Sequence, residues 1–324
     1  MDDKYNKSLS PVFLVGTLFC GSTLIGRELT ARLTNTHYIG ESINFLEYDK
    51  LYHPHPRGIK RLCVECGKEV HSGSRRECIF FDEKQRNNSS FNNIQKFIND
   101  ASLAFSKDNI IDGSKYVAWL QLYLSQGNYD TKPKVIITLR SPFAFADSFR
   151  KRNNCTLYEA ASIWRDTYVD ALRTVNSHSL NCLTIRYEDF MDNMDDAVKD
   201  ISKFLSNTKI RKNTDYTQCH SIGGNPNSLA YILGSGEVEK FINEQDKLNQ
   251  TTELNDFVKN SKQYWSNDLK KDTKWYSGIR SEEISQIIQT PGLVDLANLF
   301  GYNLYDELKL FINENTIQQE NTEA

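Results

Sequence analysis

Short apolar runs alternate along the chain with segments whose apolar residues recur at helical spacing. The first run, Pro11–Val15 (PVFLV), is typical of a buried strand, and the apolar residues from Leu24 to Leu33 predict a helix that begins near Ser22. Further strands are predicted at Asn109–Ile111, Lys134–Leu139 and Cys182–Tyr187, and helices at Asn92–Phe105, Phe143–Arg152, Leu157–Val175, 197–205 and Leu293–Leu299. This alternation predicts an α/β fold with a mostly parallel central sheet flanked by helices.

The 324 residues are enough for one large domain with a sizeable core. We expect this domain to span residues 11–312, between a disordered N-terminus at 1–10 and a frayed polar tail at 313–324. Within it, residues 52–90 have little periodicity and many Cys, His, Arg and Lys side chains. We interpret this segment as an insert in the domain.

Charge and hydropathy exclude several classes of protein. A net charge of −3 argues against general nucleic-acid binding. No apolar stretch approaches the ~20 residues of a transmembrane helix, and the polar first ten residues lack the apolar core of a secretory signal. We therefore expect a cytoplasmic protein without a transmembrane segment, whose 7 cysteines are thiols or metal ligands instead of disulfides.

A glycine-bounded loop, Gly16–Thr23 (GTLFCGST), lies between the first predicted strand and the first predicted helix. Backbone N–H groups and a helix N-terminus make such a loop suited to bind an anion. The glycines have the spacing of a nucleotide-binding P-loop, but Ser22 occupies the position of its lysine, which favours a smaller anion than a triphosphate. The alternative is an ordinary strand–helix turn that requires two glycines.

Charged residues follow two predicted strands and one further short apolar piece. Arg140 ends the strand before a helix that Ser141 is placed to cap, and there it can bind a phosphate or pair with a surface carboxylate. Lys115 ends the segment that begins with Asn109–Ile111. Glu41 follows a short apolar piece, where it is either a general base or a solvated surface residue.

The insert contains a Cys-x-x-Cys-Gly sequence of the kind found in zinc knuckles. The candidate ligands are Cys63, Cys66 and Cys78, together with one histidine among His53, His55 and His71. The second half of a usual zinc motif is missing, so three buried thiols without a metal are the alternative.

Four segments, taken in order, resemble the motifs of the sulfotransferases that use 3′-phosphoadenosine 5′-phosphosulfate (PAPS). They are Gly16–Leu24 (GTLFCGSTL), Ile111–Lys115 (IDGSK), Thr138–Arg152 (TLRSPFAFADSFRKR) and Ile185–Phe190 (IRYEDF). Gly301-Tyr302 also fits the family, while Gly40-Glu41, the Cys-rich insert and His220–Asn225 (HSIGGN) resemble a bacterial branch. The resemblance covers residues 11 to about 302 and implies the P-loop-like sulfotransferase architecture.

The resemblance also implies roles for individual residues. Arg140 and Ser148 would bind the 3′-phosphate of the nucleotide, Lys115 would lie against the 5′-phosphate, and Glu41 would be the catalytic base. The remaining nucleotide-binding residues would be Leu18, Phe19, Cys20, Gly21, Ser22 and Thr23 of the loop, Tyr187 near the adenine, and Gly224.

The expected reaction is transfer of the sulfuryl group from PAPS to a hydroxyl or amine of a small-molecule, saccharide or peptide acceptor. PAPS would be the co-substrate, and a zinc ion in the insert would have only a structural role. Phe19 departs from the family, which commonly has Arg or Lys there, and Ser228 replaces an Arg often found in the bacterial branch. The alternatives are a P-loop nucleotide kinase or NTPase, and a nucleotide-binding homologue whose turnover the Phe19 change impairs.

Overall fold

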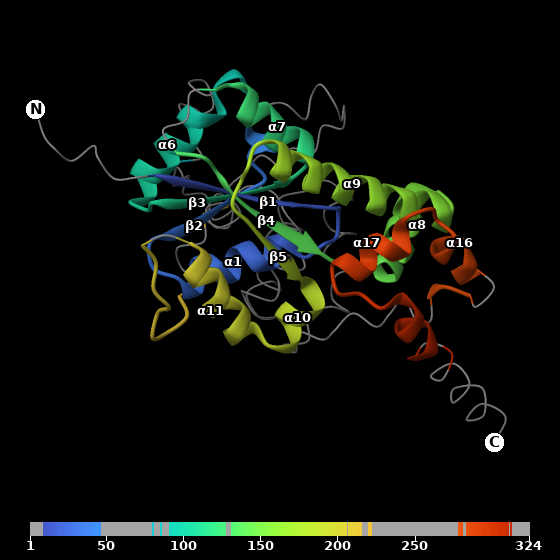
Figure 1. Ribbon diagram of the computed structural model, residues 1–324. Helices are drawn as coiled ribbons and strands as arrows, with labels where there is room; N and C mark the ends of the chain where they lie inside the picture. The colour runs from blue at the N-terminus through green and yellow to red at the C-terminus, as the bar shows by residue number, and fades with distance from the viewer. Residues whose placement is uncertain are drawn as a thin grey trace, which may run out of the picture.

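The computed structural model describes residues 9–46, 80, 85, 91–127, 131–205, 207–215, 220–221, 278–280, 283–310 and 312. Its centre is a five-stranded sheet with the order β2-β3-β1-β4-β5, in which every neighbouring pair is parallel (Figure 1). The strands are β1 (Ser10–Gly16), β2 (Thr36–Gly40), β3 (Asn109–Lys115), β4 (Lys134–Leu139) and β5 (Cys182–Arg186). The predicted α/β fold with a parallel sheet is confirmed.

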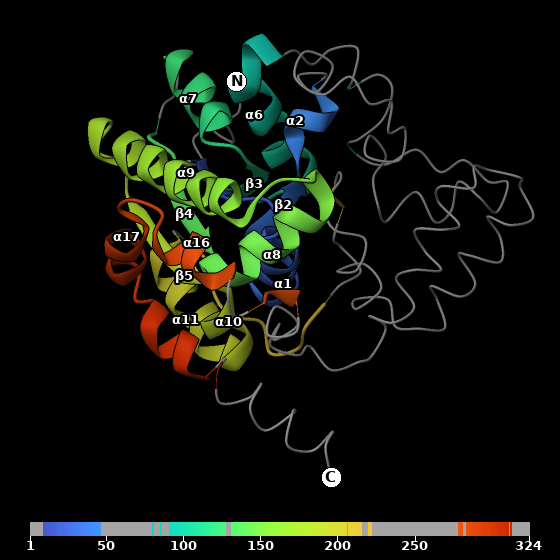
Figure 2. The same ribbon diagram turned by 90° about the vertical axis from the view of Figure 1, so that its right-hand side faces the viewer.

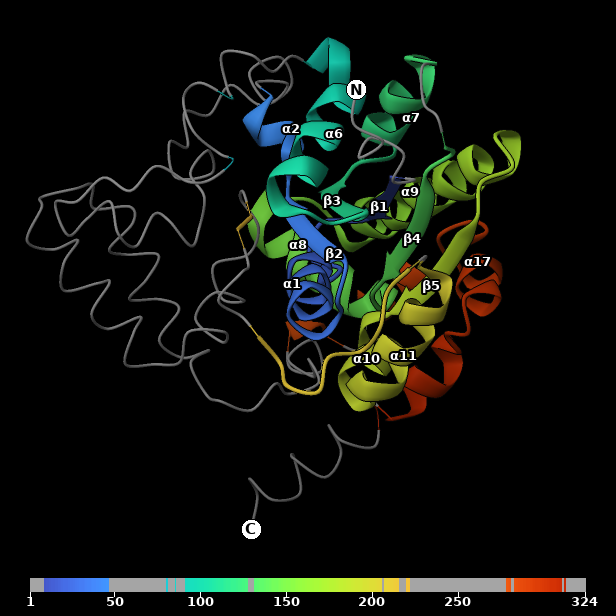
Figure 3. The same cartoon turned by 90° about the vertical axis from the view of Figure 1, so that its left-hand side faces the viewer.

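Helices cover both faces of this sheet. They are α1 (Ser22–Arg32), α2 (Ser42–Phe45), η3 (Phe91–Asn93), α6 (Ile94–Phe105), α7 (Val117–Ser125), α8 (Pro142–Asn153), α9 (Leu157–Ser177), α10 (Tyr187–Asp192), α11 (Met194–Phe204), α16 (Ile284–Ile288) and α17 (Leu293–Leu299). Helices α1, α10 and α11 lie on one side of the sheet, and α6, α7 and α9 lie on the other (Figure 3). None of these described helices has the length and hydropathy that a membrane crossing requires.

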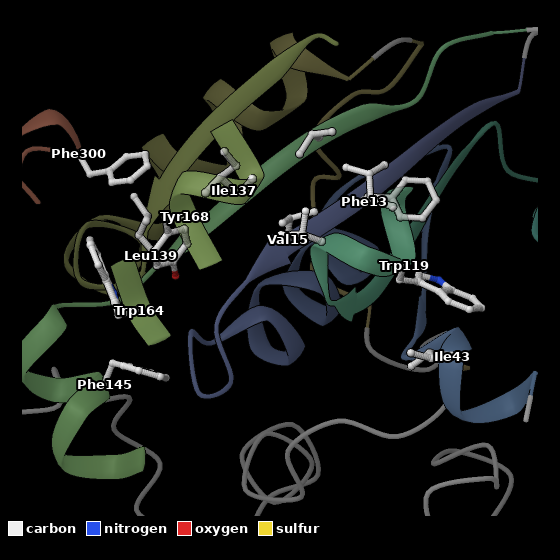
Figure 4. Packing of buried hydrophobic residues seen from close by; sticks show 14 of the residues in the cluster. Phe13, Val15, Ile43, Trp119, Ile137, Leu139, Phe145, Trp164, Tyr168 and Phe300 are labelled. Carbon is white, nitrogen blue, oxygen red and sulfur yellow. The ribbon is translucent and has the colours of Figure 1, made fainter. Parts of the chain in front are cut away.

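The two faces of the sheet are buried in separate apolar clusters, because successive side chains of a strand point to opposite faces. On β1, Phe13 and Val15 join the cluster that includes Trp119 of α7 (Figure 4). Val12 and Leu14 join the cluster of α1 and α11. Burial on both faces explains why the strands are continuous apolar runs in the sequence.

The C-terminal helices α16 and α17 lie beside α8 and α9 (Figure 2). Ile284, Ile287 and Leu293 are buried in the same cluster as Trp164 of α9. The prediction that Leu293–Leu299 forms core in a final helical layer is confirmed, because Leu293, Leu296 and Ala297 are buried.

Strand register brings the candidate residues to one edge of the sheet. Gly16 pairs with Thr138, and Val15 pairs with Lys115. Leu139 of β4 lies opposite Arg186 of β5. Since parallel strands all end at the same edge, the residues that follow β1, β2, β4 and β5 meet there, which is where α/β sheets bind ligands.

Candidate functional site

The loop after β1 has the backbone of an anion site. Phe19 and Gly21 adopt the left-handed conformation, with φ of 65° and 82°. A Cβ on Gly16 would lie 2.4 Å from the carbonyl oxygen of Thr138, so only glycine lets the loop begin against β4. Helix α1 begins at Ser22, directly after the loop. The predicted strand–loop–helix unit is confirmed, and loops of this kind bind anions at the helix N-terminus.

A buried network of polar side chains supports the loop on the side that faces the protein interior. The Sγ of Cys20 lies 3.0 Å from the Oγ1 of Thr138, and the hydroxyl of Tyr168 donates to the Thr138 carbonyl at 2.8 Å. The same hydroxyl lies 3.3 Å from the Oγ1 of Thr17. Cys20 therefore directs its side chain into the protein and leaves any ligand contact to its backbone. The support from Tyr168 was missed, because in the sequence it is only one apolar position of a helix.

Arg140 lies where β4 ends, and it contacts the loop. Its side chain is buried to 8% exposure, and its Nη1 donates to the carbonyl of Phe19 at 3.0 Å. The indole Nε1 of Trp164 donates to the Arg140 carbonyl at 2.9 Å. As predicted, Ser141 is the N-cap residue of α8, but its side chain makes no capping hydrogen bond and its hydroxyl donates instead to Oε2 of Glu307 at 2.6 Å.

A second arginine approaches the loop from the last turn of α8. The guanidinium of Arg152 lies 4.5 Å from the centre of the Phe19 ring, within the range of a cation–π contact. Arg152 is exposed and forms no ion pair with a carboxylate of the described residues. The loop lacks a cation at position 19, but α8 places one beside it. Sequence reasoning missed this contact, although the basic triplet Arg150–Arg152 was a signal for it.

Tyr187 contacts the loop, and Ser148 lies on α8. Ser148 is half-buried on α8, one helical turn before Arg152, and it makes no hydrogen bond with the rest of the described residues. Tyr187 begins α10 and lies against Gly21, where a Cβ would be 2.2 Å from the ring carbon Cδ2. Glycine is thus required at position 21 for two reasons: its positive φ and the close approach of the Tyr187 ring. Gly224, the other predicted nucleotide-binding residue, is outside the described residues.

The two predicted catalytic residues form an ion pair. Lys115, at the end of β3, donates from Nζ to Oε1 of Glu41, which directly follows β2. Their side chains are 7% and 13% exposed. Burial acts to lower the pKa of Lys115, but the charges of Glu41 and Tyr38 and the hydrogen bond to Glu41 together outweigh it, so the pKa lies above its usual value. Lys115 is therefore a buried cation with a carboxylate in contact.

Tyr38 was not predicted as part of the site, yet its side chain lies beside this pair. Burial raises the pKa of Tyr38 to about 12, and the charges of Lys115 and Glu41 act on its hydroxyl in opposite directions. The ring fits between Gly26 of α1 and Gly113 of β3, where a Cβ would be 2.3 Å and 2.4 Å from ring atoms. Neither glycine has a positive φ. Glycine is therefore needed at positions 26 and 113 because a larger side chain would collide with the Tyr38 ring.

Asp112 organises the backbone on both sides of the ion pair. It accepts from the N–H and hydroxyl of Ser114 at 2.8 Å and 2.6 Å, from Trp119 Nε1 at 2.9 Å, and from the Ser42 hydroxyl. Ser114 precedes Lys115, and Ser42 follows Glu41. The pKa of the Asp112 carboxyl is raised by its burial. The Asp of the IDGSK segment is thus structural, and it holds together the two segments that carry the catalytic candidates.

The metal prediction falls outside the described residues. Cys63, Cys66 and Cys78 and their candidate histidines all lie there. Among the described residues, no group of three or more His, Cys, Asp and Glu side chains is placed to hold a metal ion. The described cysteines Cys20, Cys155 and Cys182 are free thiols.

Solved structures similar to this chain include two sulfotransferase domains, whereas no family model and no curated protein matches it. One is the sulfotransferase domain from the Synechococcus PCC 7002 olefin synthase, 18% identical, covering 67% of this chain and 78% of that chain with a TM-score of 0.43. The other is the sulfotransferase domain from the curacin biosynthetic pathway, 14% identical, covering 61% and 74% with a TM-score of 0.43. The function is therefore inferred from this chain's own residues.

Proposed function

We propose that the chain is a sulfotransferase that moves a sulfuryl group from PAPS to a hydroxyl of an acceptor molecule. The observation that carries the proposal is the buried Lys115–Glu41 ion pair beside an anion loop without the P-loop lysine. A kinase needs a cation for a triphosphate within that loop. This site instead offers a cation and a carboxylate from two other strand ends.

The donor has two separate anionic ends, and in this proposal each end would be bound by a different set of groups. The backbone N–H groups of residues 18–23 and the start of α1 would hold the 5′-phosphosulfate. Arg140 and Ser148 would hold the 3′-phosphate, and Arg152 would add positive charge nearby. Tyr187, which lies against Gly21, would border the adenine.

The chemistry requires a proton acceptor and a stabilising cation. Glu41 would accept the proton of the acceptor hydroxyl, whose oxygen forms a bond to sulfur as the bond from sulfur to the 5′-phosphate oxygen breaks. Lys115 would stabilise the negative charge that this phosphate oxygen gains. The products are the sulfated acceptor and 3′,5′-bisphosphoadenosine. Because Lys115 and Glu41 are in contact, both groups can serve one reaction centre.

Calorimetric titration with 3′,5′-bisphosphoadenosine, 5′-AMP and ATP tests the donor, together with a PAPS consumption assay. We expect the bisphosphate to bind tightest and PAPS to be consumed. Arg140→Ala should weaken bisphosphate binding by about 10- to 100-fold, the scale of a hydrogen bond to a charged group. It should leave 5′-AMP binding nearly unchanged.

The other outcomes separate the alternatives. Preference for ATP would identify a nucleotide kinase or NTPase. Tight bisphosphate binding without PAPS consumption would identify a binding protein whose turnover is lost. Equal losses for both adenosine phosphates in Arg140→Ala would show that Arg140 does not bind the 3′-phosphate.

A further inference from the structure

We propose that Glu188 is a positioning residue of the nucleotide site, which fastens the end of β4 to the C-terminal segment Gly301–Glu307. This inference rests on the proposed function, because it concerns the strand end that presents Arg140 to a 3′-phosphate. Glu188 lies in the IRYEDF segment and Tyr302 in the Gly301-Tyr302 pair, and neither residue has a role in the proposed sulfuryl transfer.

Both carboxylate oxygens of Glu188 are engaged. Oε1 accepts from the backbone N–H of Ser141 at 2.8 Å, and Oε2 accepts from the hydroxyl of Tyr302 at 2.8 Å. Ser141 directly follows Arg140, and its own hydroxyl donates to Oε2 of Glu307 at 2.6 Å. The peptide after Arg140 is thus held by two carboxylates, one from α10 and one from the C-terminal segment.

Arg186 of β5 completes the attachment of the C-terminal segment. Its Nη1 donates to the carbonyl of Gly301, and its guanidinium lies 5.2 Å from the centre of the Tyr302 ring. Two further bonds of 2.7 Å join Arg186 to the carboxylate of Asp189. Gly301 has a φ of 79°, a conformation that favours glycine. The segment lies beside α10, at the edge of the sheet where Arg140 is found (Figure 1).

The attachment fixes the backbone on both sides of the Arg140 side chain. The carbonyl of Arg140 accepts from Trp164, and the next N–H donates to Glu188. The pKa of Tyr302 is raised by burial and by the charge of Glu188, so the phenol stays protonated and keeps donating. An arginine that binds a phosphate through several parallel bonds depends on such fixed geometry. Loss of the attachment should therefore weaken the contribution of the 3′-phosphate in particular.

The test compares Tyr302→Phe with a matched control, Tyr123→Phe. Each removes one buried phenol hydroxyl that donates to a side-chain oxygen, but Tyr302 donates to the Glu188 carboxylate whereas Tyr123 of α7 donates to the amide oxygen of Gln95 on α6. For each variant and the parent, calorimetry gives the dissociation constants of 5′-AMP and 3′,5′-bisphosphoadenosine. The dissociation constant of 5′-AMP divided by that of the bisphosphate measures how much the 3′-phosphate contributes to binding. We expect this ratio to fall by about threefold to tenfold in Tyr302→Phe, the size of one hydrogen bond, and to stay at the parent value in Tyr123→Phe.

An unchanged ratio in Tyr302→Phe, or an equal fall in Tyr123→Phe, would overturn the positioning role. Glu188→Gln provides a second variant, in which we expect an equal or larger fall because it disturbs both bonds of the carboxylate. A parent protein that binds 5′-AMP as tightly as the bisphosphate would instead overturn the proposed donor, and the positioning role with it. Failure of the inference alone leaves the parent's preference for the bisphosphate intact.

Discussion

At the scale of single residues, steric fit and charge pairing define the site. Tyr38 lies between two glycines on different elements, and its hydroxyl shares the electrostatic environment of the Lys115–Glu41 pair. Asp112 fixes the backbone of the residues next to that pair. The reacting groups are therefore held by neighbours that would not themselves touch a substrate.

Replacing Gly113 by alanine tests the fit of Tyr38. The new Cβ would lie 2.4 Å from ring atoms of Tyr38, so the ring or β3 must shift. We expect a loss of about 1–3 kcal/mol in the free energy of unfolding, the usual cost of overpacking, measured by urea denaturation. In a Tyr38→Ala background the same substitution should cost much less. An equal cost in both backgrounds would show that the ring is not what excludes a side chain at position 113.

The catalytic pair is tested by Glu41→Gln and Lys115→Ala. Each should lower kcat for PAPS consumption by about 100-fold or more, the scale of one general base or one cation at a developing charge. Glu41→Gln should change bisphosphate affinity much less than it changes kcat. The control is the exposed Lys96–Asp100 pair on α6, where Lys96→Ala should leave kcat unchanged. Parent-like turnover in Glu41→Gln would place the base on another residue.

At the scale of elements, α8 connects the two parts of the proposed nucleotide site. It begins directly after Arg140-Ser141, and its last turn carries Arg152 over Phe19. Asp147 and Arg150 on the same helix form an ion pair of 3.7 Å, and Arg150 donates to the carbonyl of Gly278 at 2.7 Å. A movement of α8 would therefore shift the loop, Arg140 and the chain at Gly278 together.

The contact between Arg152 and Phe19 predicts a measurable coupling. Arg152→Ala should raise the dissociation constant of the bisphosphate by about threefold to tenfold, because it removes a positive charge beside the loop. Phe19→Leu should raise the same dissociation constant by a smaller factor, because the ring that orients Arg152 is gone. A double-mutant cycle by calorimetry should give about 0.5–1 kcal/mol of coupling. Arg173→Ala, an exposed arginine of α9, is the control. Additive losses would show that Phe19 does not orient Arg152.

At the scale of the whole molecule, a long-range contact joins the outer strand to a distant part of the chain. His37 of β2 hydrogen-bonds through Nε2 to the carbonyl of His220 at 2.8 Å, and its ring stacks on Phe105 at 3.7 Å. The pKa of His37 is lowered to about 3, mainly by burial and also by the nearby charges of His220 and Lys107, while the hydrogen bond to the His220 carbonyl acts in the opposite direction. His37 is therefore neutral in the folded protein at all ordinary pH values.

This burial predicts a loss of stability in mild acid. The unfolded chain binds a proton at His37 below pH 6.5, whereas the folded chain does not until about pH 3. The contribution of His37 to the free energy of unfolding is thus fully present above pH 6.5 and decreases as the pH drops toward 3. Between pH 7 and pH 5 the parent should lose about 2 kcal/mol more than His37→Phe, by urea denaturation at each pH. The same pH dependence in both proteins would contradict a buried neutral His37.

The sequence determined four of the five strands, most of the helices and the strand–loop–helix unit, because these depend on patterns of neighbouring residues. It also placed Lys115 and Arg140 at strand ends, which parallel strands bring to one edge, whereas the strand before Glu41 became clear only in the structure. The motifs marked the Gly301-Tyr302 segment without giving its task.

Only the tertiary structure decided which of these residues touch. It turned the thiol of Cys20 inward, placed Arg152 over Phe19, and joined Glu188 to Ser141 and Tyr302. Such contacts join residues far apart in the chain, and they depend on register, helix packing and available space. None of these leaves a local pattern in the sequence, so hydrophobic periodicity predicts the elements of this protein but not the contacts between their side chains.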